Sequence, residues 1–227
     1  MTSIASLTIE AADTTAADAF HAALFQGATI TPAADLAGLV RSRGTAAPST
    51  GFLGFSVSLV VGRPADVDAF LAAAVGAGAT TVKPAEKSFW GYGGTVQAPD
   101  GTVWKVATSE KKDTGPATRV IERIVLQLGV ADVAASKAFY ADRGFAVAKA
   151  FGRKYVEFAA TDSAPIVLAL LSRKAVAKDA GVPVEGGGSH RLVLGVEGAG
   201  FADPDGYVAE AVDVAAGAAH GRGQHLS

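Results

Sequence analysis

The segment Leu7-Thr-Ile-Glu-Ala-Ala-Asp13 decides how the chain is interpreted, because it recurs as Leu126-Gln-Leu-Gly-Val-Ala-Asp132. Both copies alternate apolar and polar residues, as a half-buried strand does, and both end in Ala-Asp. Each is followed by a helical segment that carries a phenylalanine at the same offset, Phe20 in the first copy and Phe139 in the second. The chain is therefore predicted to contain an internal repeat, which determines the whole fold.

A second pair of matching segments lies near the ends of the two halves. Pro99-Asp-Gly101 and Pro204-Asp-Gly206 each precede a short apolar segment. Pro-Asp-Gly favours a tight turn, because proline sets φ, aspartate bonds the local backbone and glycine accepts positive φ. Each turn is predicted to lead into the last strand of its half.

Between these anchors the halves differ in length. The strand predicted over Phe55–Val61 resembles His190–Val196, but the second half then lacks about 30 residues. In the first half, the corresponding residues include an apolar-periodic helix over Ala65–Gly76, a strand over Thr80–Lys83 and a loop over Phe89–Gly94. The second half is therefore predicted to be shortened.

These patterns predict an α+β fold with mixed, curled sheets, since several strands follow each helix. Domain 1 is expected over residues 1–109 and domain 2 over 119–214, joined by a polar linker at 110–118 that contains Gly-Pro. A flexible tail is expected over 215–227, which is rich in glycine, alanine and histidine.

Composition narrows the class of protein. The 227 residues include 20 basic and 22 acidic side chains, without the basic excess of a nucleic-acid binder. No cysteine is present, which excludes disulfides and thiolate chemistry. No apolar stretch is long enough to span a bilayer, and the first residues do not resemble a signal peptide. We expect a cytoplasmic protein, a monomer or a homodimer, with a small-molecule ligand as its partner.

Three features together resemble the vicinal oxygen chelate superfamily of glyoxalases, bleomycin-resistance proteins and extradiol dioxygenases. They are the strand-helix segment Ile124–Tyr140, the run Trp90-Gly-Tyr-Gly93, and Phe201-Ala-Asp-Pro-Asp-Gly-Tyr-Val-Ala-Glu210. The resemblance covers residues from about 3 to 214. It implies tandem βαβββ modules, two to a domain, each pair curling a sheet into a cup that holds a ligand or a metal ion.

The resemblance also implies where a metal ion would bind, namely a His or Gln on the first strand of a module and a Glu on its last strand. In the first half these positions are Ser6, Phe55 and Lys105, none of which suits a cation. In the second half they are Val125, His190 and Glu210. His190 and Glu210 are thus the candidate ligands for Zn, Ni, Mn or Fe, although two protein ligands are fewer than catalytic sites use.

Strand alternation places Ser6, Thr8 and Glu10 on one face, which by the family pattern lines the cup. Lys105 should face the same cup, where it either neutralises Glu10 or orients a polar ligand. Gln127 shares a strand face with Val125. Trp90 and Tyr92, in a glycine-rich run, suit stacking on a planar ligand. The candidate ligand-binding residues are Ser6, Thr8, Glu10, Trp90, Tyr92, Lys105 and Gln127.

These features allow three alternative hypotheses about function. The preferred hypothesis is metal-independent binding of a small, partly aromatic molecule, similar to bleomycin-resistance proteins and requiring no cofactor. The second is a divalent-metal-dependent lyase, isomerase or dioxygenase that uses His190 and Glu210. The third is a non-enzymatic interaction protein whose exposed sheet edges are covered by another chain.

Overall fold

The computed structural model describes residues 1–31, 34–188 and 191–212. The predicted tail at 215–227 and the candidate ligand His190 lie outside these residues. The helices are α1 (Thr14–Phe25), α2 (Leu36–Leu39), α3 (Pro64–Gly76), α4 (Val133–Asp142) and α5 (Arg173–Ala180). The strands are β1 (Ile4–Ala11), β2 (Thr29–Ile30), β3 (Val40–Gly44), β4 (Ser49–Gly51), β5 (Phe55–Val61), β6 (Thr80–Ser88), β7 (Gly91–Gln97), β8 (Val103–Thr108), β9 (Val120–Val130), β10 (Val147–Phe151), β11 (Tyr155–Phe158), β12 (Ile166–Ser172), β13 (Gly186–Gly188), β14 (Leu192–Val196), β15 (Phe201–Ala202) and β16 (Val208–Ala211).

The repeated aspartates start the two helices that follow the repeated strands. The Asp13 carboxylate accepts a hydrogen bond from the Ala16 amide, and the Asp132 carboxylate accepts from the amides of Ala134 and Ala135. An aspartate in this position satisfies amides that have no partner within the helix. The recurring Ala-Asp is therefore a strand end followed by a helix N-cap, which confirms the strand-helix prediction in both halves.

The chain forms four consecutive modules. Module 1 runs from β1 to β3, module 2 from β5 to β8, module 3 from β9 to β12, and module 4 from β14 to β16. Modules 2 and 3 have the predicted βαβββ order. Module 4 has no helix within 191–212, as the shortening of the second half predicted.

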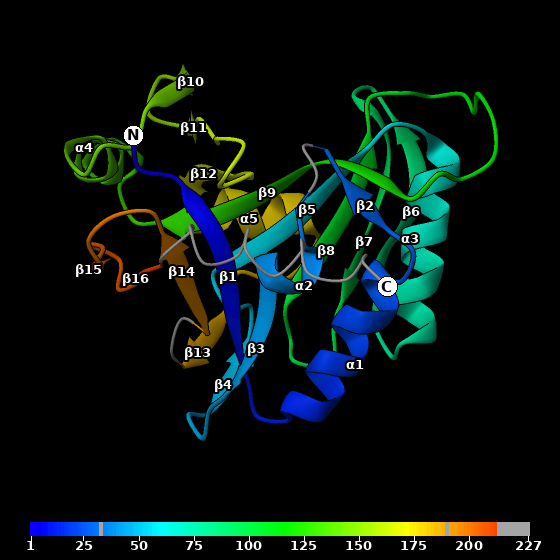
Figure 1. Cartoon of the computed structure of the whole chain (residues 1–227), viewed down its shortest axis with the longest axis horizontal. Helices are drawn as coiled ribbons and strands as arrows, with labels where there is room; N and C mark the ends of the chain where they lie inside the picture. Colours follow the sequence, from blue (N-terminus) through cyan, green and yellow to red (C-terminus); the bar gives the residue numbers. More distant parts are fainter. Residues whose placement is uncertain (32–33, 189–190, 213–227) are drawn as a thin grey trace, which may run out of the picture.

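Strand pairing joins module 2 to module 3 and module 1 to module 4. One part of the sheet, here called the 2–3 sheet, has the order β6-β7-β8-β5-β9-β12-β11-β10. The other part, the 1–4 sheet, has the order β15-β16-β14-β1-β3. They connect where Ile4 of β1 pairs with Ile166 of β12. Figure 1 shows β1 crossing in front of β5 and β9 in the centre of the view.

Both pairings cross the segment 110–118. β5 pairs antiparallel with β9, and β1 pairs antiparallel with β14. Each sheet therefore takes one module from either side of the linker, whereas the sequence suggested that both modules of a cup come from the same half. The domain boundaries at 109 and 119 stay a prediction.

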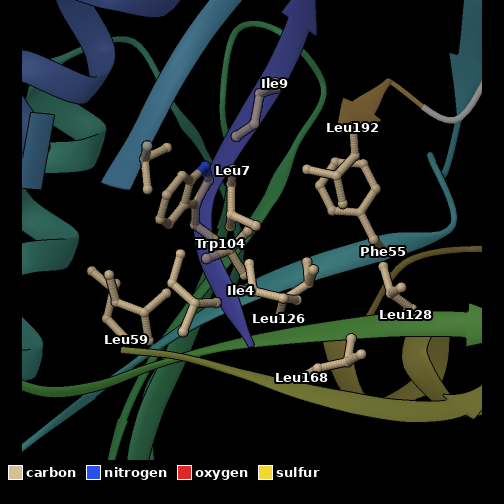
Figure 2. Packing of buried hydrophobic residues seen from close by; sticks show 14 of the residues in the cluster. Ile4, Leu7, Ile9, Phe55, Leu59, Trp104, Leu126, Leu128, Leu168 and Leu192 are labelled. Atoms are coloured by element: carbon tan, nitrogen blue, oxygen red, sulfur yellow. The ribbon is translucent and has the colours of Figure 1, made fainter. Parts of the chain in front are cut away.

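A single apolar cluster lies between the two sheets and the helices. Leu7 and Ile9 of β1 belong to this cluster together with Phe55 of β5 and Leu126 of β9, and all four are fully buried (Figure 2). Trp104 of β8 fills the same interior. The opposite faces of the two sheets consequently point away from this core, because side chains alternate along a strand.

The run Phe89–Gly94 is not the loop that the sequence suggested. Phe89 and Trp90 form the tip of the β6–β7 hairpin, and β7 begins at Gly91. A Cβ atom at Gly93 would lie 2.8 Å from the Val106 carbonyl oxygen. The glycines therefore permit close packing of neighbouring strands, and glycine content alone did not distinguish this from a loop.

A buried carboxylate anchors the segment between β8 and β9. Asp66 of α3 accepts hydrogen bonds from the amides of Thr118 (2.6 Å) and Arg119 (2.7 Å). Arg119 has φ of 54°, a left-handed conformation that is unfavourable for a residue with a side chain. Its guanidinium donates to the carbonyl oxygens of Leu24 and Ala69, which ties α1 to α3. The segment is thus held firmly at its end.

Replacing Asp66 with alanine should lower the free energy of unfolding by ~2–4 kcal/mol, because the amides of Thr118 and Arg119 lose a buried acceptor. Urea unfolding followed by circular dichroism measures this change. Asp68→Ala is the matched control on the same helix, since Asp68 is exposed and accepts a hydrogen bond from the Tyr92 hydroxyl at the surface. Equal destabilisation in the two variants would contradict the anchoring role of Asp66.

Among the described residues, no helix is long and apolar enough to cross a bilayer.

Candidate functional site

The outer face of the 1–4 sheet carries charged and hydroxyl side chains. Ser6 and Glu10 project from β1 on the face opposite the core, as the alternation predicted, and Thr8 lies between them. The register places Glu10 beside Arg43 of β3. It also aligns Ser6 with Gly195 of β14, which in turn lies beside Glu210 of β16.

Arg43 binds both carboxylates of this face. Its Nη2 lies 2.7 Å from Glu10 Oε1, and its Nη1 lies 3.1 Å from Glu210 Oε1. The hydrogen bonds with Glu10 and then Glu210 raise the pKa of Arg43 above its ordinary value. Arg41, on the same strand face, donates to Ser6 Oγ at 3.2 Å. A guanidinium therefore lies between the acidic groups of this face.

The described residues of this face are arranged unfavourably for a divalent cation. Glu210, one of the two candidate metal ligands, is already paired with Arg43, and a cation placed here would be repelled by that guanidinium. Nowhere in residues 1–31, 34–188 and 191–212 do three or more His, Cys, Asp or Glu side chains gather as a metal site requires.

The outer face of the 2–3 sheet is less polar. Ser58 of β5 lies between Lys105 of β8 and Val125 of β9. Two residues earlier on β5, Ser56 Oγ donates a hydrogen bond to Gln127 Oε1 at 2.9 Å. Gln127 is therefore bound to a hydroxyl group, and the other groups at these positions are poor metal ligands.

Helix α5 packs on this face. Its buried residues Val176, Ala177 and Ala180 contact Phe52 and Val103 in a separate apolar cluster. At its C-terminal end the Lys105 ammonium lies 2.8 Å from Asp179 Oδ2. Lys83 donates to the backbone oxygens of Lys178 and Asp179, at 3.2 and 2.7 Å. Cations at the carboxyl end of a helix are stabilising, so both lysines hold α5 against the sheet.

A hollow of about 280 Å³ remains between the β6–β7 hairpin, β8 and the end of α5. It is lined in part by Trp90, Lys105, Asp179, Thr95 and Glu86. We call it the Trp90 groove. The structure thus places the predicted residues Trp90 and Lys105 in one hollow.

Tyr92 contributes to the Trp90 groove without directing its hydroxyl into it. Thr95 pairs with Lys105, so alternation puts the Tyr92 side chain on the other face of β7. There its hydroxyl donates to Asp68 at 2.8 Å, and this bond raises the Tyr92 pKa.

The other predicted residues lie elsewhere. Ser6, Thr8 and Glu10 lie on the outer face of the 1–4 sheet, and the core separates that face from Lys105. The predicted pairing of Glu10 with Lys105 is wrong, because Glu10 pairs with Arg43 and Lys105 pairs with Asp179.

The sequence interpretation missed three charged residues of these faces. Arg41 and Arg43 alternate around Ser42, a pattern that could have indicated a strand with both arginines on one face. Asp179 lies on a helix 74 residues from Lys105 along the chain, and no local pattern signals that contact.

Solved structures resemble this chain although its sequence does not reveal close relatives. No protein-family model and no curated protein match the sequence. Glyoxalase I from Zea mays superposes with a TM-score of 0.60 at 12% identity, over 95% of this chain and 93% of that chain. A single-residue mutant of the same enzyme has a TM-score of 0.62 at 13% identity, over the same shares of the two chains. These likenesses show that the fold is glyoxalase-like.

We expect Lys105→Met and Asp179→Asn each to destabilise the fold by at most ~1 kcal/mol, because pairs that remain in contact with water contribute little. The two side chains are 28% and 38% exposed. The double variant should lose less than the sum of the single losses, as chemical denaturation of all three proteins would show. Lys178→Met, on the same helix, is the control. Strict additivity would mean that the ion pair does not hold α5.

Proposed function

We propose that this chain, which has the glyoxalase-like fold of the vicinal oxygen chelate superfamily, binds a small, partly aromatic molecule without a metal ion. The observation that carries the proposal is the Trp90 groove, where an exposed indole and the partly exposed Lys105–Asp179 ion pair line one hollow. Aromatic rings with a few polar groups are the usual lining of small-molecule sites.

The hairpin tip holds Trp90 in a defined position. Its amide donates to Ser88 Oγ at 3.1 Å, while its side chain is 83% exposed. Gly91 has φ of 138°, and a Cβ atom there would collide with the Thr108 carbonyl. A residue other than glycine would therefore displace the tip. The fixed backbone presents the ring at little entropic cost on binding.

Charge in the Trp90 groove favours a polar ligand of low net charge. Lys83 and Lys105 are balanced by Glu86 and Asp179, and Thr95 adds a hydroxyl group. A strongly charged molecule would have to compete with the Lys105–Asp179 pair, whereas a neutral or zwitterionic one could bond to it.

The ion pairs on the two outer sheet faces also support ligand binding without a metal ion. The resemblance implies metal ligands at the strand positions of Ser6, Phe55 and Lys105 in the first half and of Val125, His190 and Glu210 in the second, and His190 lies outside the described residues. Glu210 is bound by Arg43, Lys105 is itself a cation, and valine cannot ligate. Binding through rings and hydrogen bonds needs none of these groups as ligands.

A planar aromatic ligand should quench Trp90 emission. We expect members of a panel of aromatic amino acids, indoles and hydroxybenzamides to quench the wild-type chain saturably. Trp90→Ala should weaken binding by about tenfold or more, since one stacking contact contributes ~1–3 kcal/mol. Isothermal titration calorimetry measures the affinity of both proteins.

Phe151→Ala is the matched control, because Phe151 is also an exposed aromatic residue but does not line the Trp90 groove. It should bind as the wild type does. Unchanged affinity in Trp90→Ala would refute the assignment of the groove.

Metal content tests the alternative, a metal-dependent lyase, isomerase or dioxygenase. Untagged chain purified without chelator, and then incubated with Ni, Zn, Mn or Fe, should carry far less than one ion per chain by inductively coupled plasma mass spectrometry. Near-stoichiometric metal that is lost in His190→Ala or Glu210→Gln would instead establish the metal-dependent reading.

A further inference from the structure

A second hollow, open to solvent, is lined by residues of α1, α2, β2 and β3 and has a volume of about 710 Å³. None of its lining residues belongs to the Trp90 groove or to the candidate metal positions. We call it the α1–α2 hollow, and its size is within the range of sites for small organic molecules.

Large apolar side chains form the wall of the α1–α2 hollow. They are Phe25 of α1, Ile30 of β2, Leu36 of α2 and Val40 of β3. An apolar ligand that packs on this wall gains free energy, because contact removes apolar area from water on both partners. A ligand of the hollow is therefore expected to have an apolar body.

Two exposed carboxylates, Asp18 and Asp35, also line the α1–α2 hollow. Asp18 lies on the same stripe of α1 as Ala22 and Phe25, at a spacing of four and seven residues. Its carboxylate has no hydrogen bond or ion pair with any other residue in the described part of the chain. Asp35 accepts one hydrogen bond, from the Ala37 amide to its Oδ1. Both groups are accessible to a ligand in the hollow.

Arg41 of β3 borders the α1–α2 hollow, but its side chain is directed away from it. Its neighbour Ser42 faces α1, where Oγ lies 3.3 Å from Nδ1 of His21. Side chains alternate along a strand, so the Arg41 side chain projects from the opposite face of β3. There its guanidinium donates to Ser6 Oγ at 3.2 Å. The charge of Arg41 therefore does not balance the carboxylates of the hollow.

Two further basic residues next to α1, His21 and Arg119, do not balance these carboxylates either. Burial lowers the pKa of His21, although the Asp18 and Asp100 carboxylates oppose this shift, so the imidazole is neutral at pH 7. Arg119 does not line the hollow, and its guanidinium donates to three backbone carbonyl oxygens. The charged groups that the described residues direct into the hollow are therefore negative.

We propose that the α1–α2 hollow binds a hydrophobic cation, an amine whose apolar body packs on the wall and whose ammonium group is attracted by the exposed carboxylates of Asp18 and Asp35. An ammonium group carries only hydrogen-bond donors, which a carboxylate accepts, whereas an anion would be repelled. The site goes beyond the proposed function at the Trp90 groove and is independent of it, because the two hollows share no residue.

Three probes with the same eight-carbon tail test the sign of the charge. They are octylammonium, neutral 1-octanol and anionic octanoate, each titrated into the full-length chain by isothermal titration calorimetry. Octylammonium should bind at least about tenfold more tightly than octanoate, because the two carboxylates attract one and repel the other. Octanoate binding as tight as octylammonium binding would overturn the proposal.

The place of binding is read from backbone amide signals in a ¹⁵N–¹H correlation spectrum. Octylammonium should shift the signals of Ala28 and Ala37, which line the α1–α2 hollow, and leave that of Thr95 in the Trp90 groove unchanged. Saturable binding without a shift at Ala28 and Ala37 would refute the site.

Removal of the two carboxylates tests their role. The double variant Asp18→Asn and Asp35→Asn should weaken octylammonium binding by about fivefold or more and leave 1-octanol binding unchanged, since only the cation uses the charges. Asparagine at position 35 can still cap α2, so the fold should be kept. Asp142→Asn, exposed at the end of α4 and not part of the hollow, is the control for net charge. Equal octylammonium affinity in the double variant and the control would contradict the proposal.

The length of the tail tests the apolar wall. Each methylene group that becomes buried should raise affinity about threefold, so butylammonium should bind far more weakly than octylammonium. The ratio of the two affinities should be the same in the double variant, because the wall is intact there. Equal affinity of the two amines would exclude a role for the wall.

Trp90→Ala separates this site from the proposed function. It should leave octylammonium binding unchanged while weakening aromatic ligands at the Trp90 groove. Loss of octylammonium binding in Trp90→Ala would show that the probe occupies the groove, and would refute the second site without affecting the first.

Discussion

The antiparallel pairing of β1 with β14 is the constraint on which the rest of the molecule depends. It joins the first module to the last, so the ends of the repeat meet in one sheet. The pairing brings Glu210 within reach of Arg43 and buries Leu7 and Ile9 against Phe55 and Leu126. The second pairing, β5 with β9, follows from the same geometry, because modules 2 and 3 are then left to pair with each other. Register matters at both places, since a shift of one residue would turn every side chain to the opposite face.

Ion pairs occupy the outer faces of both sheets. Where the superfamily resemblance implies metal ligands, this chain places Arg43 between two carboxylates on one face and Lys105 against Asp179 on the other. All of these side chains remain in contact with water, so the ion pairs set the charge of the two faces more than they stabilise the fold. The Lys105 pair also fixes α5 over the 2–3 sheet, which leaves the Trp90 groove at its edge. The similarity to glyoxalase I is therefore one of fold, whereas the ion pairs described here belong to this chain.

The two hollows differ as ligand sites. The Trp90 groove is small, has charged side chains in its lining and an exposed ring at its rim, and suits a ligand that stacks on the ring and forms hydrogen bonds. The α1–α2 hollow, of about 710 Å³, is lined by residues of α1, α2, β2 and β3. Large apolar side chains such as Phe25, Leu36 and Val40 line it, so removal of apolar surface from water would dominate binding there.

The sequence by itself determined the repeat, the α+β class and the positions of the strands and helices in and next to the repeated segments. β5 occupies Phe55–Val61 as predicted, and α3 begins one residue before the predicted Ala65. These features depend on local periodicity and on caps such as Asp13, which neighbouring residues encode. Tertiary structure alone decided which modules pair, and with that the partners of Glu10, Lys105 and Glu210. Those contacts join residues far apart in the chain, and their register depends on packing that no local pattern expresses.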